Sequence, residues 1–170
     1  MRSDMRHIVV CALTGAIALG SAGVLSGAER HVMESRVPAD KLAEARALTN
    51  PLSSSPEVVE KGKALYESKG GCMNCHGKEG RGDGPVAREL NPSPRNFHHR
   101  GFWRHRTDGE IFWVIKNGSP GTAMIGFGSQ LADEEIWTVI QYLGSFSGGR
   151  GPRAGGMRGG ACCKKNGGAP

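Results

Sequence analysis

Apolar residues recur at helical spacing in three stretches of the chain, and each stretch has start and stop signals. The first begins at Ser55-Pro56, an N-cap followed by proline at the first helical position, and ends before Gly70-Gly71. The second opens on the capping box Thr107–Glu110 and ends at Asn117-Gly118. The third runs from Asp133 to Phe146, with acidic residues in its first turn. The predicted apolar faces consist of Val58, Leu65, Tyr66, Ile111, Val114, Ile115, Ile136, Val139, Ile140 and Leu143.

The segments around these helices are rich in turn-forming residues. Residues 77–102 contain many Gly, Pro and Asn residues, which predicts an ordered loop. Residues 29–55 contain one short helical pattern, Lys41 to Leu48, among prolines and serines that are typical of a linker. No useful length of alternating apolar and polar residues is present, so no strand is predicted. The sequence therefore predicts an all-α, loop-rich domain at 56–148, preceded by a linker or N-terminal extension at 29–55.

The charge of the chain lies at its two ends. The net formal charge is +6, but residues 56–148 carry eleven basic and eleven acidic side chains. Because no basic face with interleaved aromatic residues is present, a nucleic-acid-binding domain is excluded. Residues 149–170 carry five basic and no acidic side chains among many glycines, which predicts a disordered basic tail.

The amino terminus has the features of an export signal. Arg2 and Arg6 precede an apolar run from Ile8 to Leu25, and the small residues Ser26-Gly27-Ala28 permit cleavage after position 28. The alternative is an uncleaved membrane anchor, because the run approaches the ~20 residues that span a bilayer. Residues 1–28 are interpreted as a cleaved signal peptide, which predicts a periplasmic or otherwise extracytoplasmic protein.

The strongest chemical signal is the pentapeptide CMNCH, residues 72–76. Its C-x-x-C-H spacing is the signature of covalent haem attachment. Thiols three positions apart reach the two vinyl groups of one haem, and the next imidazole then lies beneath the iron. A dithiol redox motif would be expected in a βαβ setting, and a zinc site would need two more ligands at suitable spacing. We therefore predict one haem c, attached to Cys72 and Cys75 and ligated by His76.

With these residues in view, positions 56–146 resemble a class I monohaem cytochrome c domain. The resemblance is carried by the ordered segments CMNCHGKEGRGDGP, NPSPRNF, PGTAMIGF and EEIWTVIQYL. It implies three main helices and long loops wrapped around one covalently attached haem. It also implies that the first and last helices cross at Gly62, with Val139 and Tyr142 packing against it and Tyr66.

The second axial ligand of the iron is predicted by elimination among six methionines. Met124 alone lies outside the ends of the chain and the attachment loop, and the resemblance places an axial methionine in its loop. In relatives, a proline often follows that methionine. This chain has Ile125 in its place, so the stiffness of the loop is left open. The alternatives are a core methionine or a second histidine ligand. The rival histidines are His98, His99 and His105.

Further contacts to the haem are implied less directly. The resemblance assigns the carbonyl of Pro85 as the acceptor for the second nitrogen of His76, although Gly84-Pro85 is also compatible with a simple turn. Arg95, Trp103 and Arg104 are candidates for binding the haem propionates, because buried carboxylates need charged or N–H partners.

Axial His and Met ligands fill the coordination of the iron and raise its potential, which favours electron transfer over O₂ or peroxide chemistry. No catalytic set of side chains is apparent, so the predicted function is a single-electron carrier between redox proteins. The alternatives are the electron-entry subunit of a periplasmic oxidoreductase complex, and a haem enzyme or gas sensor in which Met124 does not stay bound.

The basic tail has two interpretations. It is a solvated extension without a role, or a tether that contacts an acidic partner or an anionic membrane surface. Cys162 and Cys163 are adjacent and would pair poorly with each other, so an intermolecular disulfide is the sharper hypothesis for them.

Overall fold

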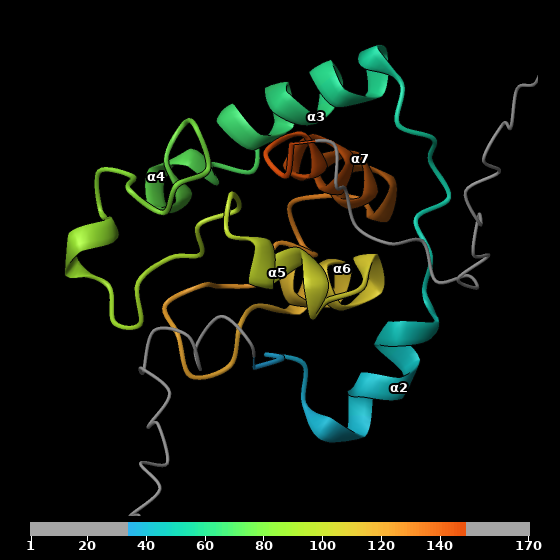
Figure 1. The fold of residues 1–170 in the computed structure, drawn as a ribbon, viewed down its shortest axis with the longest axis horizontal. Helices are drawn as coiled ribbons and strands as arrows, with labels where there is room; N and C mark the ends of the chain where they lie inside the picture. Colours follow the sequence, from blue (N-terminus) through green and yellow to red (C-terminus); the bar gives the residue numbers. More distant parts are fainter. Residues whose placement is uncertain (1–33, 149–170) are drawn as a thin grey trace, which may run out of the picture.

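The computed structural model describes residues 34–148 of the chain, and within that range it is helical with no strand. The prediction of an all-α fold is confirmed. The helices, labelled as in Figure 1, are α2 (Ala39–Ala47), α3 (Pro56–Glu67), α4 (Met73–His76), α5 (Arg100–Arg104), α6 (Asp108–Asn117) and α7 (Asp133–Ser145), with a 3₁₀ turn η1 (Ala87–Glu89).

The three main helices begin where their capping residues predict. Ser55 Oγ accepts the N–H of Val58 at the start of α3. Thr107 and Glu110 form the reciprocal capping box of α6. At α7, the Glu135 carboxylate accepts the N–H of the N-cap residue at 2.9 Å. Each bond satisfies a backbone donor that the first turn of a helix would otherwise leave free.

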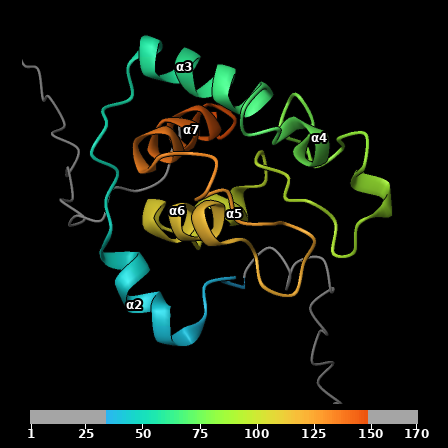
Figure 2. The same cartoon turned by 180° about the vertical axis from the view of Figure 1, so that it is seen from behind.

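Helix α3 lies over α7 (Figures 1 and 2), and the two helices approach closely at Gly62. A Cβ at Gly62 would lie 2.4 Å from the carbonyl oxygen of Thr138 and 2.8 Å from Cβ of Tyr142. Tyr66 meets Tyr142 edge to face, with ring centroids 5.3 Å apart. The expected contact with Tyr142 is present, the carbonyl oxygen of Thr138 lies nearest to a Cβ at Gly62, and Val139 is buried in the same core cluster as Tyr66.

The core lies between α6 and α7 and continues beneath the long loop. Phe112 of α6 stacks on Trp137 of α7 with centroids 4.1 Å apart. Phe97, from the loop, packs edge to face with Phe102 of α5 at 5.4 Å. The loops 77–99 and 118–132 leave this core on the same side of the domain (Figures 1 and 2). These two loops carry the residues that the sequence predicts to meet at a site.

The N-terminal extension packs on the domain in its described part, residues 34–55. Helix α2 lies against α6, and a Cβ at Gly109 would meet the carbonyl oxygen of Ala45. Asn50 Nδ2 donates to the carbonyl of Trp137 at 3.0 Å. The segment predicted as a linker or extension therefore contains a docked helix, which begins two residues before the predicted start and ends one residue before the predicted end.

Some predictions lie outside the described residues. These are the signal peptide at 1–28 and the tail at 149–170 with Cys162 and Cys163. Among residues 34–148, no helix has the length and apolar character needed to cross a membrane.

Candidate functional site

One cavity brings together the four side chains with the strongest chemical signal. Cys72, Cys75 and His76 from α4 line it, and Met124 lines it from the loop between α6 and α7. Its volume is about 450 Å³, within the ~300–1,000 Å³ typical of ligand and cofactor sites. Residues more than 45 positions apart in the chain thus face a common space of cofactor size.

The end of α3 holds α4 in place. The N–H of Cys72 donates to the carbonyl of Tyr66 at 3.0 Å, and His76 N–H donates to the carbonyl of Cys72 at 2.9 Å, which closes one helical turn. Tyr66 Oη then donates to the carbonyl of Gly77 at 2.7 Å. Burial of this hydroxyl raises the pKa of Tyr66 well above its usual range, so it remains a donor. The attachment turn is therefore fixed at both ends.

The two cysteines of this turn form no disulfide in the described structure. Burial raises the pKa of Cys72 to about 11, whereas the reactive thiol of a dithiol redox motif has a lowered pKa. Within residues 34–148, no group of three or more His, Cys, Asp or Glu side chains could hold a metal ion. The thiol chemistry therefore fits attachment to haem better than disulfide exchange.

The ring of His76 is buried and held on two sides. It stacks on Phe97 with centroids 4.7 Å apart, and its Nδ1 lies 3.1 Å from the carbonyl oxygen of Arg95. Because a carbonyl oxygen only accepts, Nδ1 carries the proton and Nε2 is left as a ligand. Burial lowers the pKa of His76, which favours the neutral ring that a metal requires.

The acceptor for His76 differs from the one that the resemblance assigned. Pro85 is exposed and does not line the cavity; Arg95 supplies the carbonyl instead. The preceding Gly84 donates its N–H to the carbonyl of Cys75 at 3.1 Å, and a Cβ there would lie 2.3 Å from the carbonyl oxygen of Asn74. This segment packs on the backbone of α4 and so does not reach the His76 ring.

The loop that carries Met124 is tied down on both sides of that residue. Its carbonyl accepts the N–H of Ser119 at 3.0 Å, and its N–H donates to Oγ1 of Thr122 at 3.2 Å. The loop ends where Phe127 N–H donates to the carbonyl of Ile115 at 2.9 Å. These bonds order the segment without a proline after Met124.

The rival histidines lie away from the cavity. His98 Nε2 lies 2.7 Å from the carbonyl of Glu79, and His99 Nδ1 accepts the N–H of Gly101. Both, and His105, are exposed, and none lines the cavity. Met124 is therefore the side chain in the described structure that is best placed to be the second ligand, and its ligation stays a prediction.

The three residues predicted to bind the haem propionates differ in whether they reach the cavity. Trp103 Nε1 donates to the carbonyl of Phe97 at 2.5 Å, and Arg104 is exposed, so neither is available to the cavity. Arg95 lines it, with both terminal guanidinium nitrogens buried and without a hydrogen-bond partner in the described structure. Burial, with the nearby cations Arg106 and Arg36, lowers the pKa of Arg95 to about 9. A buried, unsatisfied cation beside two thiols and an imidazole fits a group with carboxylates such as haem.

Several residues of the site carry no sequence motif. Arg36, Arg106 and Glu110 line a second, smaller pocket, which shares His76 and Met124 with the cavity. Glu110 is predicted from sequence only as a capping residue, and the two arginines resemble ordinary surface charges. Their burial depends on contacts between distant segments, which no local pattern shows.

Comparisons with known proteins agree with this arrangement. Residues 57–143 match the family model described as cytochrome C oxidase, cbb3-type, subunit III. A chain from a solved Kuenenia stuttgartiensis reducing HAO-like protein complex is similar, with 33% sequence identity and a TM-score of 0.52. The match covers 59% of this chain and 48% of that one, so this chain spans about half the length of the solved chain. No curated protein matches. Because the family model spans half of the chain and includes the C-x-x-C-H turn, the chain belongs to the c-type cytochrome family described as cytochrome C oxidase, cbb3-type, subunit III.

Proposed function

We propose that this chain carries single electrons by means of one haem attached to Cys72 and Cys75, with His76 and Met124 as axial ligands. The observation that carries the proposal is the common cavity lined by these four side chains. Haem iron, when bound, supplies a one-electron Fe(II)/Fe(III) couple. The chain provides the attachment thiols, the two ligand side chains and a largely apolar enclosure.

The residues around the ligands favour an iron whose coordination does not change. The Arg95 carbonyl and the Phe97 ring fix the orientation of His76, and the bonds to Ser119 and Thr122 hold the backbone of Met124. Filled axial positions exclude O₂ and peroxide from the iron, and a Met ligand raises the potential. We therefore propose an electron carrier without catalytic activity of its own.

The physiological setting is a second part of the proposal. The amino-terminal sequence supports export to the periplasm, and the family description and the solved complex support work alongside other redox proteins. A free carrier and a subunit of an oxidoreductase complex share the same site. Isolation of the native protein from membrane and periplasmic fractions separates them: a complex subunit co-purifies with larger redox proteins, and a free carrier does not.

Acid-acetone extraction tests the attachment. Haem colour should remain with the wild-type protein, and a Cys72→Ala, Cys75→Ala double variant should bind no covalent haem. Haem that passes into the solvent from the wild-type protein contradicts covalent attachment. Rapid binding of CO by the reduced wild-type protein favours a haem enzyme or gas sensor over a carrier.

A further inference from the structure

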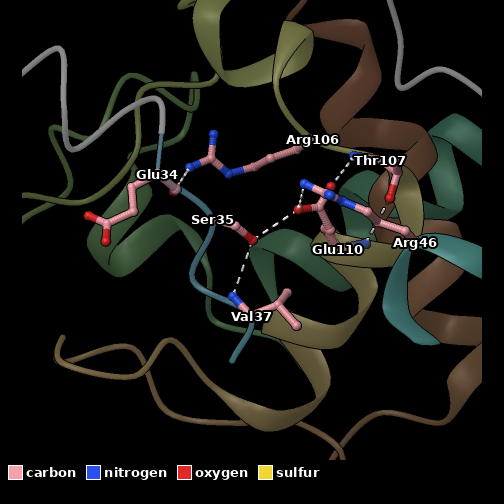
Figure 3. Close-up of polar contacts among 7 residues, drawn as sticks. All are labelled: Glu34, Ser35, Val37, Arg46, Arg106, Thr107 and Glu110. Carbon is pink, nitrogen blue, oxygen red and sulfur yellow. Dashed lines mark hydrogen bonds and ion pairs between the residues drawn. The ribbon is translucent and has the colours of Figure 1, made fainter. Parts of the chain in front are cut away.

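The carboxylate of Glu110 is almost completely buried, at 2% exposure, and its two oxygens have different partners. Oε2 accepts the N–H of Thr107 at 3.0 Å and so completes the capping box of α6. Oε1 accepts a hydrogen bond from Ser35 Oγ at 2.9 Å and lies 3.4 Å from Nη2 of Arg46 (Figure 3). Helix capping explains the first oxygen only. The second links α6 to the N-terminal segment, whose Ser35 is 75 positions away.

That segment, residues 34–48, is here called the clasp. It packs on α6 through Ala45, whose carbonyl oxygen occupies the space that a side chain at Gly109 would need. Arg106, just before α6, donates to the carbonyl of Glu34 at the start of the clasp (Figure 3). Val37 is also buried. The clasp is therefore held by packing and by two buried charged residues.

The clasp contributes to a second, smaller pocket of about 70 Å³ beside the cavity. Arg36 lines this pocket with Arg95, Arg106 and Glu110, and the pocket shares the predicted ligands His76 and Met124 with the cavity. Glu110 is the one carboxylate among the described residues that line this pocket. Both terminal nitrogens of Arg95 are buried without a hydrogen-bond partner in the described structure, which suits an anionic group beside them. The wall formed by Arg36, Arg95 and Arg106 is called the arginine wall below.

We propose that Glu110 is a positioning residue for the haem, which holds the clasp on α6 so that the arginine wall faces the haem carboxylates. The inference rests on the proposed function, because it requires a haem in the cavity. It predicts that the clasp is part of the cytochrome site, although it precedes the matched residues 57–143. Glu110 also offsets part of the positive charge of the wall, and through it affects the reduction potential.

The decisive variant is Glu110→Gln, with Glu135→Gln as its matched control. Both remove the charge of a capping glutamate and keep an oxygen that can accept the backbone N–H, but Glu135 contacts Lys69 at the start of α7 and not the clasp. Loss of the Glu110 charge raises the midpoint potential, and withdrawal of Arg36 with a loosened clasp lowers it, so the positioning role is read from Arg36 instead. Arg36→Gln should lower the potential of the wild-type protein and leave that of Glu110→Gln nearly unchanged, because the loosened clasp has already moved Arg36 away. Trypsin cleavage after Lys41 and Arg46, followed by mass spectrometry, should become about tenfold faster in Glu110→Gln only.

A second variant keeps the test decisive if Glu110→Gln folds poorly. Arg36→Gln leaves the α6 cap intact and removes a cation from the wall, so its potential should shift downward. Unchanged clasp cleavage in Glu110→Gln would overturn the inference, and so would an equal effect of Arg36→Gln on the potential in the wild-type and Glu110→Gln proteins. An unchanged potential in Arg36→Gln would overturn it as well. Absence of covalent haem from the wild-type protein, seen by acid-acetone extraction, would instead refute the proposed function and this inference with it.

Discussion

The Nδ1 atom of His76 lies 3.1 Å from the carbonyl oxygen of Arg95, a residue 19 positions further along the chain. The backbone of Arg95 thus orients the imidazole, while its side chain brings a buried guanidinium to the same cavity. One loop residue therefore supports both the proposed iron ligand and the charge balance of the site. The predictions below follow from this arrangement.

Replacing Arg95 with Gln keeps the backbone carbonyl and removes the cation. We expect the midpoint potential to fall, because a buried positive charge beside the haem stabilises the reduced state. Potentiometric titration checks this, with Arg104→Gln as the control, since Arg104 is exposed. Equal potentials for the two variants would show that Arg95 is not part of the haem site.

Replacing Tyr66 with Phe removes the hydroxyl that donates to the carbonyl of Gly77 at 2.7 Å. A buried carbonyl then lacks its donor, so we expect a loss of about 1–3 kcal/mol in the free energy of unfolding. Denaturant titration of the haem-loaded protein measures the loss. Tyr142→Phe is a suitable control, because that ring also lies in the contact between α3 and α7. If both variants unfold at the same denaturant concentration, the bond to Gly77 does not stabilise the attachment turn.

Asp108 predicts a dependence of stability on pH. Burial raises the pKa of this carboxyl from 3.8 to about 6, and its Oδ1 has no hydrogen-bond partner in the described structure. The folded protein therefore binds a proton that the unfolded chain releases, so this group makes stability fall as the pH rises from about 4 to about 6. Asp108→Asn should gain stability relative to the wild type across this window, with a constant difference above it. Melting curves at pH 4 and pH 7 test it, and a difference that does not change with pH contradicts it.

Removal of the haem should leave the protein without a cooperative fold. The cavity of about 450 Å³ sits between two loops in a domain near the size at which cofactors often supply needed stability. A Cys72→Ala, Cys75→Ala variant should show low helicity by circular dichroism and no sharp melting transition. The control is Cys162→Ala, Cys163→Ala, which should keep both haem and fold. A haem-free variant with cooperative melting would refute the prediction.

The elements that the sequence predicts best depend on local signals. Ser55 and the Thr107–Glu110 capping box mark helix starts within a few residues, and the C-x-x-C-H spacing alone predicts the attachment site. The turn η1 lies inside the predicted loop and the short helix α5 begins at its end, and both are missed because five residues or fewer give too little periodicity.

The parts that sequence analysis misplaced depend on long-range contacts between backbones. A carbonyl oxygen is chemically the same in Pro85 and Arg95, so only the path of the loop decides which one meets His76. The hydrogen bond between Ser35 and Glu110 joins residues 75 positions apart, and no sequence motif predicts it.

The most direct test of the whole account is the coordination of the iron before and after replacing Met124 with Ala. The oxidised wild-type protein should show the weak charge-transfer band at the red edge of the visible spectrum that reports a methionine–Fe(III) bond, and its reduced form should bind CO slowly or not at all. Met124→Ala should lose the band, bind CO rapidly and have a lower midpoint potential. An unchanged spectrum and potential in Met124→Ala would contradict the account and direct the search for the second ligand to His98, His99 and His105.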